Sequence, residues 1–211
     1  RARASSSEGR VGRLLARHLQ ARPGSALVAD NDPSSPDRLG YLFAHDSVHG
    51  RYRGEVAVDG SDLVIDGDRL RVLAERDPAA LPWAKLGVDY VFEATGLFSS
   101  RDKAAQHLAA GARRVVITAP GKDADATFVV GVNHELFDPG KHQVVSNASC
   151  TTNCLAPMVK VLHETVGVEH GWLTTIHAYT NDQRILDVQH PKDMRRARAA
   201  AINIIPSSTG A

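Results

Sequence analysis

The sequence predicts an α/β protein in which a doubly wound parallel sheet, residues 1–149, is followed by the start of an α+β domain, residues 150–211. Short apolar runs alternate with helical patterns up to about residue 149, and that alternation is typical of a parallel sheet covered by helices. A hydrophobic content of 43% in 211 residues is enough to form a packed core.

The elements of the first region are predicted from their spacing. Apolar residues recur at helical intervals in 11–19 and 101–110, and Gly111 follows the second pattern where a left-handed C-cap is expected. Three short runs separated by glycine turns predict antiparallel strands, and the near-continuous apolar run 88–94 predicts a buried parallel strand. In chain order, the expected helices are residues 11–19, 41–44 and 101–110, and the expected strands are residues 26–29, 55–58, 63–65, 70–73, 88–94, 115–118, 128–130 and 144–145.

The second region begins with a predicted helix. Apolar residues from Leu155 to Val166 fall on one helix face. Pro157 lies inside that pattern and is expected to kink the helix or to start its regular part. Residues 171–180 are predicted to form a strand whose partner strands are not in this sequence.

Composition excludes several classes of function. The 25 basic and 24 acidic residues give a net charge of +1, which argues against a dedicated nucleic-acid or membrane-surface protein. No apolar run approaches the roughly 18 to 20 residues of a membrane span, and the polar N-terminus lacks the apolar core of a secretory signal. The two cysteines indicate a reducing compartment without a disulfide framework. We therefore expect a cytoplasmic protein with neither a nucleic-acid nor a membrane partner.

The most informative stretch is residues 145–157, which places Cys150 among small hydroxyl residues just before the helical pattern. The positive end of a helix favours a thiolate, and the neighbours Ser149 and Thr151 suit anion binding better than a dry core. The alternative is a buried structural cysteine. Cys154, one helical turn further on, also allows a structural pair or half of a metal site. No third cysteine and no nearby histidine with ligand spacing exists, so no metal is expected.

A thiolate nucleophile needs a base, and His177 lies near the end of the predicted strand 171–180. A Cys/His pair on an α/β chain is typical of acyl transfer. The chain has ten histidines, so spacing alone does not select this one. A hydrogen-bonded strand histidine is the alternative.

Two further groups of residues have the chemistry to bind phosphate-containing ligands. Gly9, Arg10 and Val11 open the first helix, where a pyrophosphate can approach, although a glycine pair at a helix start is more often a plain turn. Asp32 follows about 20 residues later, at the spacing of a ribose-binding carboxylate or simply as a turn residue before proline. This fingerprint is incomplete, because Ser7 occupies its first glycine position and no apolar strand precedes it.

The second group lies near the other end of the chain. The arginines in 195–198 are interpreted either as a phosphate clamp or as a solvated basic helix face. The hydroxyl cluster 207–210 either holds another phosphate or is simply a loop.

Taken together, the chain resembles the phosphorylating glyceraldehyde-3-phosphate dehydrogenase family from about Gly9 to Ala211. The blocks that carry the resemblance stand in family order and are residues 46–50, 74–78, 93–96, 146–157, 177–180 and 204–210. The resemblance implies a Rossmann-type NAD-binding domain followed by the first part of the catalytic domain, with Cys150 as nucleophile and His177 as its base. The implied NAD-binding residues are Gly9, Arg10, Val11, Asp32, Arg76, Thr95, Gly96 and Thr118. The implied phosphate-binding residues are Ser149, Thr151, Thr180, Arg196, Thr209 and Gly210.

The implied reaction is NAD-dependent oxidative phosphorylation of D-glyceraldehyde 3-phosphate to 1,3-bisphosphoglycerate through a Cys150 thioester, with inorganic phosphate as second substrate. Asp32 favours NAD over NADP because a carboxylate repels a 2′-phosphate, although Val188 and Gln189 replace the Leu-Pro common in NAD-preferring members. A full-length chain would form the family homotetramer. The alternatives are an erythrose-4-phosphate dehydrogenase-like paralogue, which hydrolyses its thioester, and a catalytically inert nucleotide-binding fragment.

The chain departs from the family pattern at both ends. Residues 1–8 are polar where the family has an apolar strand leading to its glycine loop, so the central strand of the nucleotide sheet is expected to be missing or replaced. Roughly the last third of the family's length is absent, and that part carries most of the second sheet and much of the tetramer contact surface.

Overall fold

The computed structural model describes residues 1–6 and 9–211, which divide into two compact units, Arg1–Cys150 (unit 1) and Thr151–Ala211 (unit 2). Ser7, the residue at the first position of the nucleotide fingerprint, lies outside the described residues.

Unit 1 is built on one large sheet with the strand order β10-β11-β9-β8-β1-β2-β7-β6-β5 among the described residues. Neighbouring strands from β10 to β7 run parallel, and β5, β6 and β7 form an antiparallel edge. The strands are β1 (Ala2–Ser6), β2 (Ala26–Asn31), β5 (Val56–Asp59), β6 (Asp62–Ile65), β7 (Asp68–Leu73), β8 (Tyr90–Glu93), β9 (Arg114–Ile117), β10 (Ala126–Thr127) and β11 (Val144–Ser146). A separate ribbon pairs β3 (His45–Asp46) with β4 (Gly50–Arg51).

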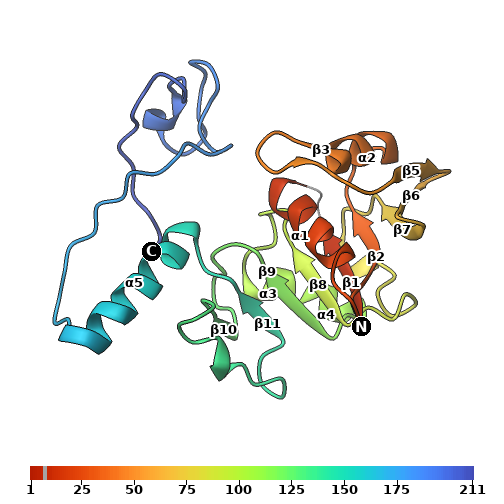
Figure 1. Ribbon diagram of the computed structural model, residues 1–211, viewed down its shortest axis with the longest axis horizontal. Helices are drawn as coiled ribbons and strands as arrows, with labels where there is room; N and C mark the ends of the chain where they lie inside the picture. Colours follow the sequence, from red (N-terminus) through yellow and green to blue (C-terminus); the bar gives the residue numbers. More distant parts are fainter. Residues whose placement is uncertain (7–8) are drawn as a thin grey trace. The chain divides into compact units, whose positions relative to one another are not determined.

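Short helices connect these strands. Helix α1 (Arg10–Gln20) lies over β1 and β2, as Figure 1 shows. The other helical segments of unit 1 are α2 (Pro36–Ala44), α3 (Arg101–Ala104), α4 (Gln106–Ala109) and the 3-10 turns η1 (Pro78–Ala80) and η2 (His134–Leu136). Parallel strands joined by helices give the doubly wound α/β fold that the sequence predicts.

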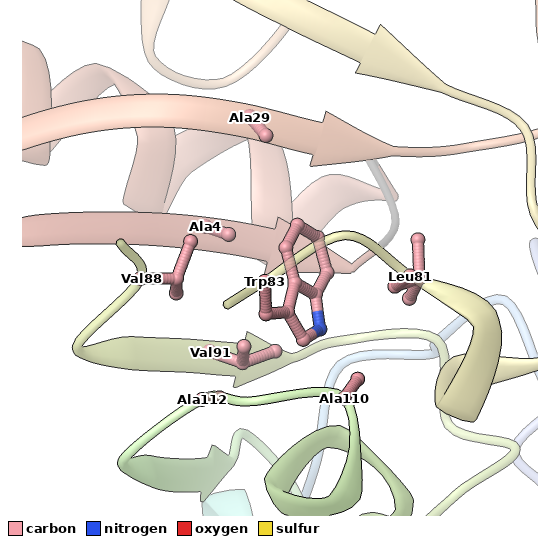
Figure 2. Packing of buried hydrophobic residues seen from close by; sticks show 8 residues of the cluster. All are labelled: Ala4, Ala29, Leu81, Trp83, Val88, Val91, Ala110 and Ala112. Carbon is pink, nitrogen blue, oxygen red and sulfur yellow. The ribbon is translucent and has the colours of Figure 1, made fainter. Parts of the chain in front are cut away.

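The expectation that the central strand is missing or replaced is wrong. β1 pairs with β2 on one side and β8 on the other, so a polar segment forms the centre of the sheet. Pairing on both sides satisfies the backbone, and strand formation depends on such neighbours more than on intrinsic preference. Figure 2 shows why small side chains suit this place: Ala4 and Ala29 leave room for the indole of Trp83, which is fully buried against them.

Apolar residues cover both faces of the sheet. Val91 of β8 belongs to the cluster around Trp83, while its neighbour Phe92 packs against a second cluster that includes Leu19 of α1 and Phe43 of α2. A third cluster joins Ala104 of α3 to β9 and β11. A strand with apolar residues on both faces is expected in a covered parallel sheet.

Two predicted elements of unit 1 differ in detail. The helix expected at 101–110 is divided at Ala105 into α3 and α4. No strand forms at 128–130; β10 ends at Thr127, and the backbone N–H of Val129 donates to the Asn133 side chain (2.9 Å) instead of continuing a ladder. The antiparallel strands predicted between 55 and 73 are confirmed as β5, β6 and β7.

Unit 2 begins with helix α5 (Cys150–Val166), whose first residue is the last residue of unit 1. Pro157 lies in the interior of this helix. A 3-10 turn, η3 (Met194–Ala197), is the other regular element described there. The strand predicted at 171–180 is wrong, because no described segment pairs with it and an isolated strand cannot satisfy its backbone groups. Among the described residues, no helix combines the length and apolar character needed to cross a membrane.

Candidate functional site

The parallel strands of unit 1 bring several predicted site residues to one edge of the sheet. Segments that follow β1, β2, β8, β9 and β11 all begin at the carboxyl ends of these strands, and ligands of doubly wound sheets bind at that edge. The predicted residues in these segments are Gly9, Arg10, Val11, Asp32, Thr95, Gly96, Thr118, Ser149 and Cys150.

The start of α1 is suited to an anion. Gly9 is the N-cap, Arg10 and Val11 are exposed, and the first turn contains no acidic residue. The unpaired N–H groups and the positive dipole end of a helix attract phosphate. Gly12 is buried, so the helix can approach the sheet closely at this end.

The end of β2 holds two neighbouring polar residues with different roles. Asp32 follows the strand and accepts a hydrogen bond from the backbone N–H of Ser34 (2.8 Å), which fixes its carboxylate at the edge. Asn31 makes a reciprocal pair with Glu75: its amide donates to the Glu75 carbonyl and its oxygen accepts from the Glu75 N–H, both at 2.9 Å. This pair anchors the loop that carries the exposed Arg76.

Glu93 organises the ends of β8 and β9. Its Oε1 accepts hydrogen bonds from the backbone N–H (2.8 Å) and the hydroxyl of Thr95, and its carbonyl accepts from the Thr118 hydroxyl (3.1 Å). Gly96 has φ +74°, a conformation that favours glycine. Glu93 therefore positions Thr95 through its buried carboxylate and Thr118 through its backbone carbonyl, with Gly96 next to Thr95 in the chain.

Ser146 shapes the turn that leads to Cys150. Its hydroxyl donates to the Ala119 carbonyl (2.7 Å) and accepts from the N–H groups of Gly121 (2.9 Å) and Ala148 (3.0 Å). Ala148 has φ +62°, which lets the chain turn sharply from β11 into α5. Cys150 is the first residue of α5 and is exposed, so the alternative of a buried structural cysteine does not hold.

Cys154 is exposed as well, and neither cysteine is bonded in a disulfide. Among the described residues, no group of three or more histidine, cysteine, aspartate or glutamate side chains is placed to hold a metal ion.

His177 lies on an irregular, exposed segment of unit 2. Its Nδ1 is 2.6 Å from the Ala178 carbonyl oxygen. A carbonyl oxygen only accepts, so Nδ1 carries the hydrogen and Nε2 of the neutral ring is the basic nitrogen. Cys150 belongs to unit 1 and His177 to unit 2, and the pairing of their side chains stays a prediction.

The three arginines between residues 195 and 198 are each paired with a carboxylate. Arg195 binds Asp193 (2.8 Å), and the guanidinium together with the Arg195 N–H lowers the pKa of that carboxyl to about 2. Arg198 lies 3.2 Å from Asp187. The basic face predicted for this segment is therefore a row of ion pairs and not a row of uncompensated cations.

Arg196 contacts a hydroxyl group in addition to a carboxylate. It binds Asp182, and its Nη2 donates to the Ser207 hydroxyl (2.5 Å), which brings the loop of Thr209 and Gly210 to the same part of unit 2. His190 supports the arrangement because its Nδ1 accepts from the Asp193 N–H (3.0 Å). Thr180 is positioned separately, with its N–H donating to the Gln183 side chain (3.0 Å).

Two family models match the chain. The model described as "Glyceraldehyde 3-phosphate dehydrogenase, NAD binding domain" matches residues 7–101, and "Glyceraldehyde 3-phosphate dehydrogenase, C-terminal domain" matches residues 149–211. The chain belongs to the glyceraldehyde-3-phosphate dehydrogenase family. The resemblance and the Rossmann-type α/β fold are thereby confirmed, and the first matched region is the family's NAD-binding domain.

Relatives named glyceraldehyde-3-phosphate dehydrogenase are similar over nearly the whole chain. The protein of Geobacillus stearothermophilus is 55% identical over 203 residues, that of Pseudomonas aeruginosa 56% over 206 residues, and that of Thermotoga maritima 52% over 205 residues. Each match covers 96% of this chain but only 60% to 61% of the relative. The chain therefore spans about three fifths of the length of these family members.

Some residues at the carboxyl edge of the sheet were not singled out from the sequence. Asn31 and Ser146 end β2 and β11, and a polar residue closing an apolar strand was the available signal for both. Trp83 contacts His107, and His107 contacts Glu93. The three residues come from separate segments, so these contacts could not be found without the structure.

Proposed function

We propose that this chain carries the NAD site and the nucleophile of a phosphorylating glyceraldehyde-3-phosphate dehydrogenase. Its substrates are D-glyceraldehyde 3-phosphate and inorganic phosphate, and its product is 1,3-bisphosphoglycerate. The observation that carries the proposal is the position of Cys150, an exposed thiol at the first residue of α5, after a strand of the same parallel sheet whose edge holds Asp32 and Thr95.

The residues at this edge fit NAD. The start of α1, with Arg10 exposed and no acidic side chain in the first turn, suits the pyrophosphate. The Asp32 carboxylate accepts hydrogen bonds and suits a ribose, while the Asn31 pair holds the Arg76 loop for the adenine end. Thr95, Gly96 and Thr118 line the part of the edge nearer the nicotinamide. Bound NAD supplies a hydride acceptor, which no side chain can provide.

Cys150 and His177 perform the covalent chemistry. The helix start favours the anionic thiolate, which attacks the aldehyde carbon, and His177 Nε2 accepts the hydroxyl proton of the adduct. The backbone N–H groups at the start of α5 stabilise the oxyanion. Because Cys150 keeps the acyl group as a thioester, phosphate can displace the sulfur and leave as an acyl phosphate.

Two anion sites serve this sequence of steps. Ser149, Thr151, Thr209 and Gly210, with Arg196 nearby, hold the inorganic phosphate, and Thr180 helps to hold the phosphate of the substrate. The Arg196–Ser207 contact supports this role, since it joins a guanidinium to the loop that contains two of these residues. We also propose the division of domains after residue 149, a cytoplasmic location, and a homotetramer for a full-length chain.

Thiol labelling and phosphate dependence test the proposal. We expect iodoacetamide at neutral pH to label Cys150 roughly tenfold faster than Cys154, because α5 favours the thiolate at its first residue only. Cys150→Ser should abolish turnover and keep NAD binding, with Cys154→Ser as the matched control. Equal labelling of the two thiols contradicts an activated nucleophile.

Turnover decides between the alternatives. A rate that rises with inorganic phosphate supports the phosphorylating enzyme, and equal rates with and without phosphate indicate the erythrose-4-phosphate dehydrogenase-like alternative, which hydrolyses its thioester. NAD binding without any turnover assigns the chain to the inert nucleotide-binding alternative.

A further inference from the structure

Three polar side chains form a connected chain inside unit 1. The Trp83 indole N–H donates to His107 Nδ1 (3.0 Å), and His107 Nε2 lies 3.2 Å from Glu93 Oε2. Their relative exposure is 0%, 0% and 1%. Figure 2 shows the indole nitrogen on the edge of the ring that faces Ala110, away from Ala4 and Ala29.

The donor at one end fixes the protonation of the whole chain. An indole N–H only donates, so His107 Nδ1 must accept and its hydrogen must sit on Nε2. His107 Nε2 then donates to Glu93, which receives this bond as a carboxylate. Trp83 thus sets the tautomer of His107, and His107 orients the carboxylate of Glu93.

The other carboxylate oxygen holds the turn after β8. Glu93 Oε1 accepts from the N–H and the hydroxyl of Thr95, and the Thr95 oxygen in turn accepts from the Leu97 N–H (2.9 Å). Gly96, between them, has φ +74°. Thr95, and through it Leu97, are therefore connected by Glu93 to the buried His107 and Trp83.

A buried carboxylate is a costly way to stabilise a fold, because apolar residues of similar volume often do so at least as well. Its advantage here is direction: a carboxylate accepts from His107 on one oxygen and from Thr95 on the other, while all of these partners are donors. The arrangement accordingly specifies one conformation of the turn.

We propose that Trp83, His107 and Glu93 are positioning residues that hold the Thr95–Gly96–Leu97 turn in the conformation that binds the nicotinamide end of NAD. This inference rests on the proposed NAD site. None of the three needs to touch NAD; they act through Thr95.

Glu93→Gln tests the donor and acceptor pattern with almost no change in volume. The new amide presents N–H groups either to His107 Nε2–H or to Thr95 N–H, so two donors face each other in both orientations. His107 cannot relieve the conflict by changing tautomer while Trp83 donates to Nδ1. We expect NAD affinity, measured by calorimetry on the full chain, to fall about tenfold, the effect of one lost buried hydrogen bond.

A second substitution should restore part of that loss. Trp83→Phe removes the indole N–H, so His107 can carry its hydrogen on Nδ1 and accept from the new amide with Nε2. We expect the double variant Glu93→Gln/Trp83→Phe to bind NAD more tightly than Glu93→Gln alone. Tyr52→Phe, which removes a 2.6 Å bond to Asp66 elsewhere in unit 1, is the control and should leave NAD affinity unchanged.

A measurement without NAD separates this inference from the proposed function. Nitrogen-15 NMR of the free chain should show His107 as the Nε2–H tautomer, and Glu93→Gln should shift the amide signals of Gly96 and Leu97 and speed their hydrogen exchange. Unchanged amides in that variant overturn the positioning role whether or not NAD binds. If the original chain fails to bind NAD, the proposed function fails. If it binds and Glu93→Gln binds equally well, only the positioning role fails.

Discussion

Single polar side chains hold the loops of unit 1 against the sheet. Asn31 fixes the loop of Arg76, Ser146 fixes the turn before Cys150, and Asp66 accepts from both the Tyr52 hydroxyl (2.6 Å) and the Glu55 N–H (2.8 Å). A side chain that satisfies backbone groups fixes a loop at little cost, because those groups need partners in any conformation. Such residues are hard to predict, since each depends on a contact with a distant segment.

The hydroxyl of Tyr52 makes the stability of unit 1 depend on pH. Burial and the hydrogen bond to Asp66 raise its pKa from 10.0 to about 12. A raised pKa in the folded state means that the contribution to stability is complete below pH 10 and is lost as pH rises toward 12. We expect the free energy of unfolding to decline over this interval.

Urea denaturation at a series of pH values between 9 and about 12 measures the effect. Tyr52→Phe has no ionisable hydroxyl, so its decline over the same interval should be smaller. Parallel curves for the two proteins would mean that Tyr52 titrates normally in the folded chain.

Elements form where neighbouring segments complete them. The polar run 2–6 becomes β1 because β2 and β8 pair with it on both sides, whereas the more apolar run 171–180 stays irregular because no described strand pairs with it. Sequence patterns predicted the buried strand that became β8 and the antiparallel strands β5, β6 and β7 correctly, since their alternation and turns are local properties. Whether the runs 2–6 and 171–180 form strands depends on pairing partners, which their own residues do not specify.

The backbone after α4 requires a glycine at position 111, and this requirement can be tested. It has φ +104°, and a Cβ placed there would lie 2.5 Å from the Cβ and 2.7 Å from the Cα of Ala84. The Ala84 N–H donates to the Ala110 carbonyl (3.0 Å), so the two backbones cannot easily separate. We expect Gly111→Ala to lower the free energy of unfolding by about 3 kcal/mol, from strain and overpacking together.

Gly24→Ala is the matched control for this effect. Gly24 also has a positive φ, +76°, but a Cβ there meets nothing within 4 Å. The backbone strain alone should cost about 1 kcal/mol. Equal losses for the two variants, measured by urea denaturation, would show that the contact with Ala84 relaxes without cost.

At the scale of the whole chain, the topology of unit 1 explains which parts of the site could be predicted. Residues such as Asp32, Thr95 and Cys150 follow strands whose carboxyl ends share one edge, so short motifs located them in the sequence. Trp83 and His107 could not be found in this way, because Trp83 contacts His107, and His107 contacts Glu93, only where separate segments meet in the folded core. The phosphate-binding roles proposed for unit 2 came from the family resemblance. The backbone of unit 2 is irregular after α5, so no strand ends indicate where its binding residues should lie.

The two tryptophans report on the two units separately. Trp83 is fully buried in unit 1, and Trp172 is fully exposed in unit 2. Contact with water shifts indole emission to longer wavelengths and lets acrylamide collide with the ring. We therefore expect Trp172→Phe to shift the emission of the chain to shorter wavelengths and to remove most of the fluorescence that acrylamide quenches.

The same variant isolates the unfolding of unit 1. Trp83 packs against β1, β2 and β8, so its emission should change in one cooperative step as urea unfolds the sheet. Trp172 has no packing to lose, and the original protein should show the same midpoint with a smaller fractional change. If Trp172→Phe leaves the quenching unaltered, the ring of Trp172 is covered in solution, which contradicts its full exposure in unit 2.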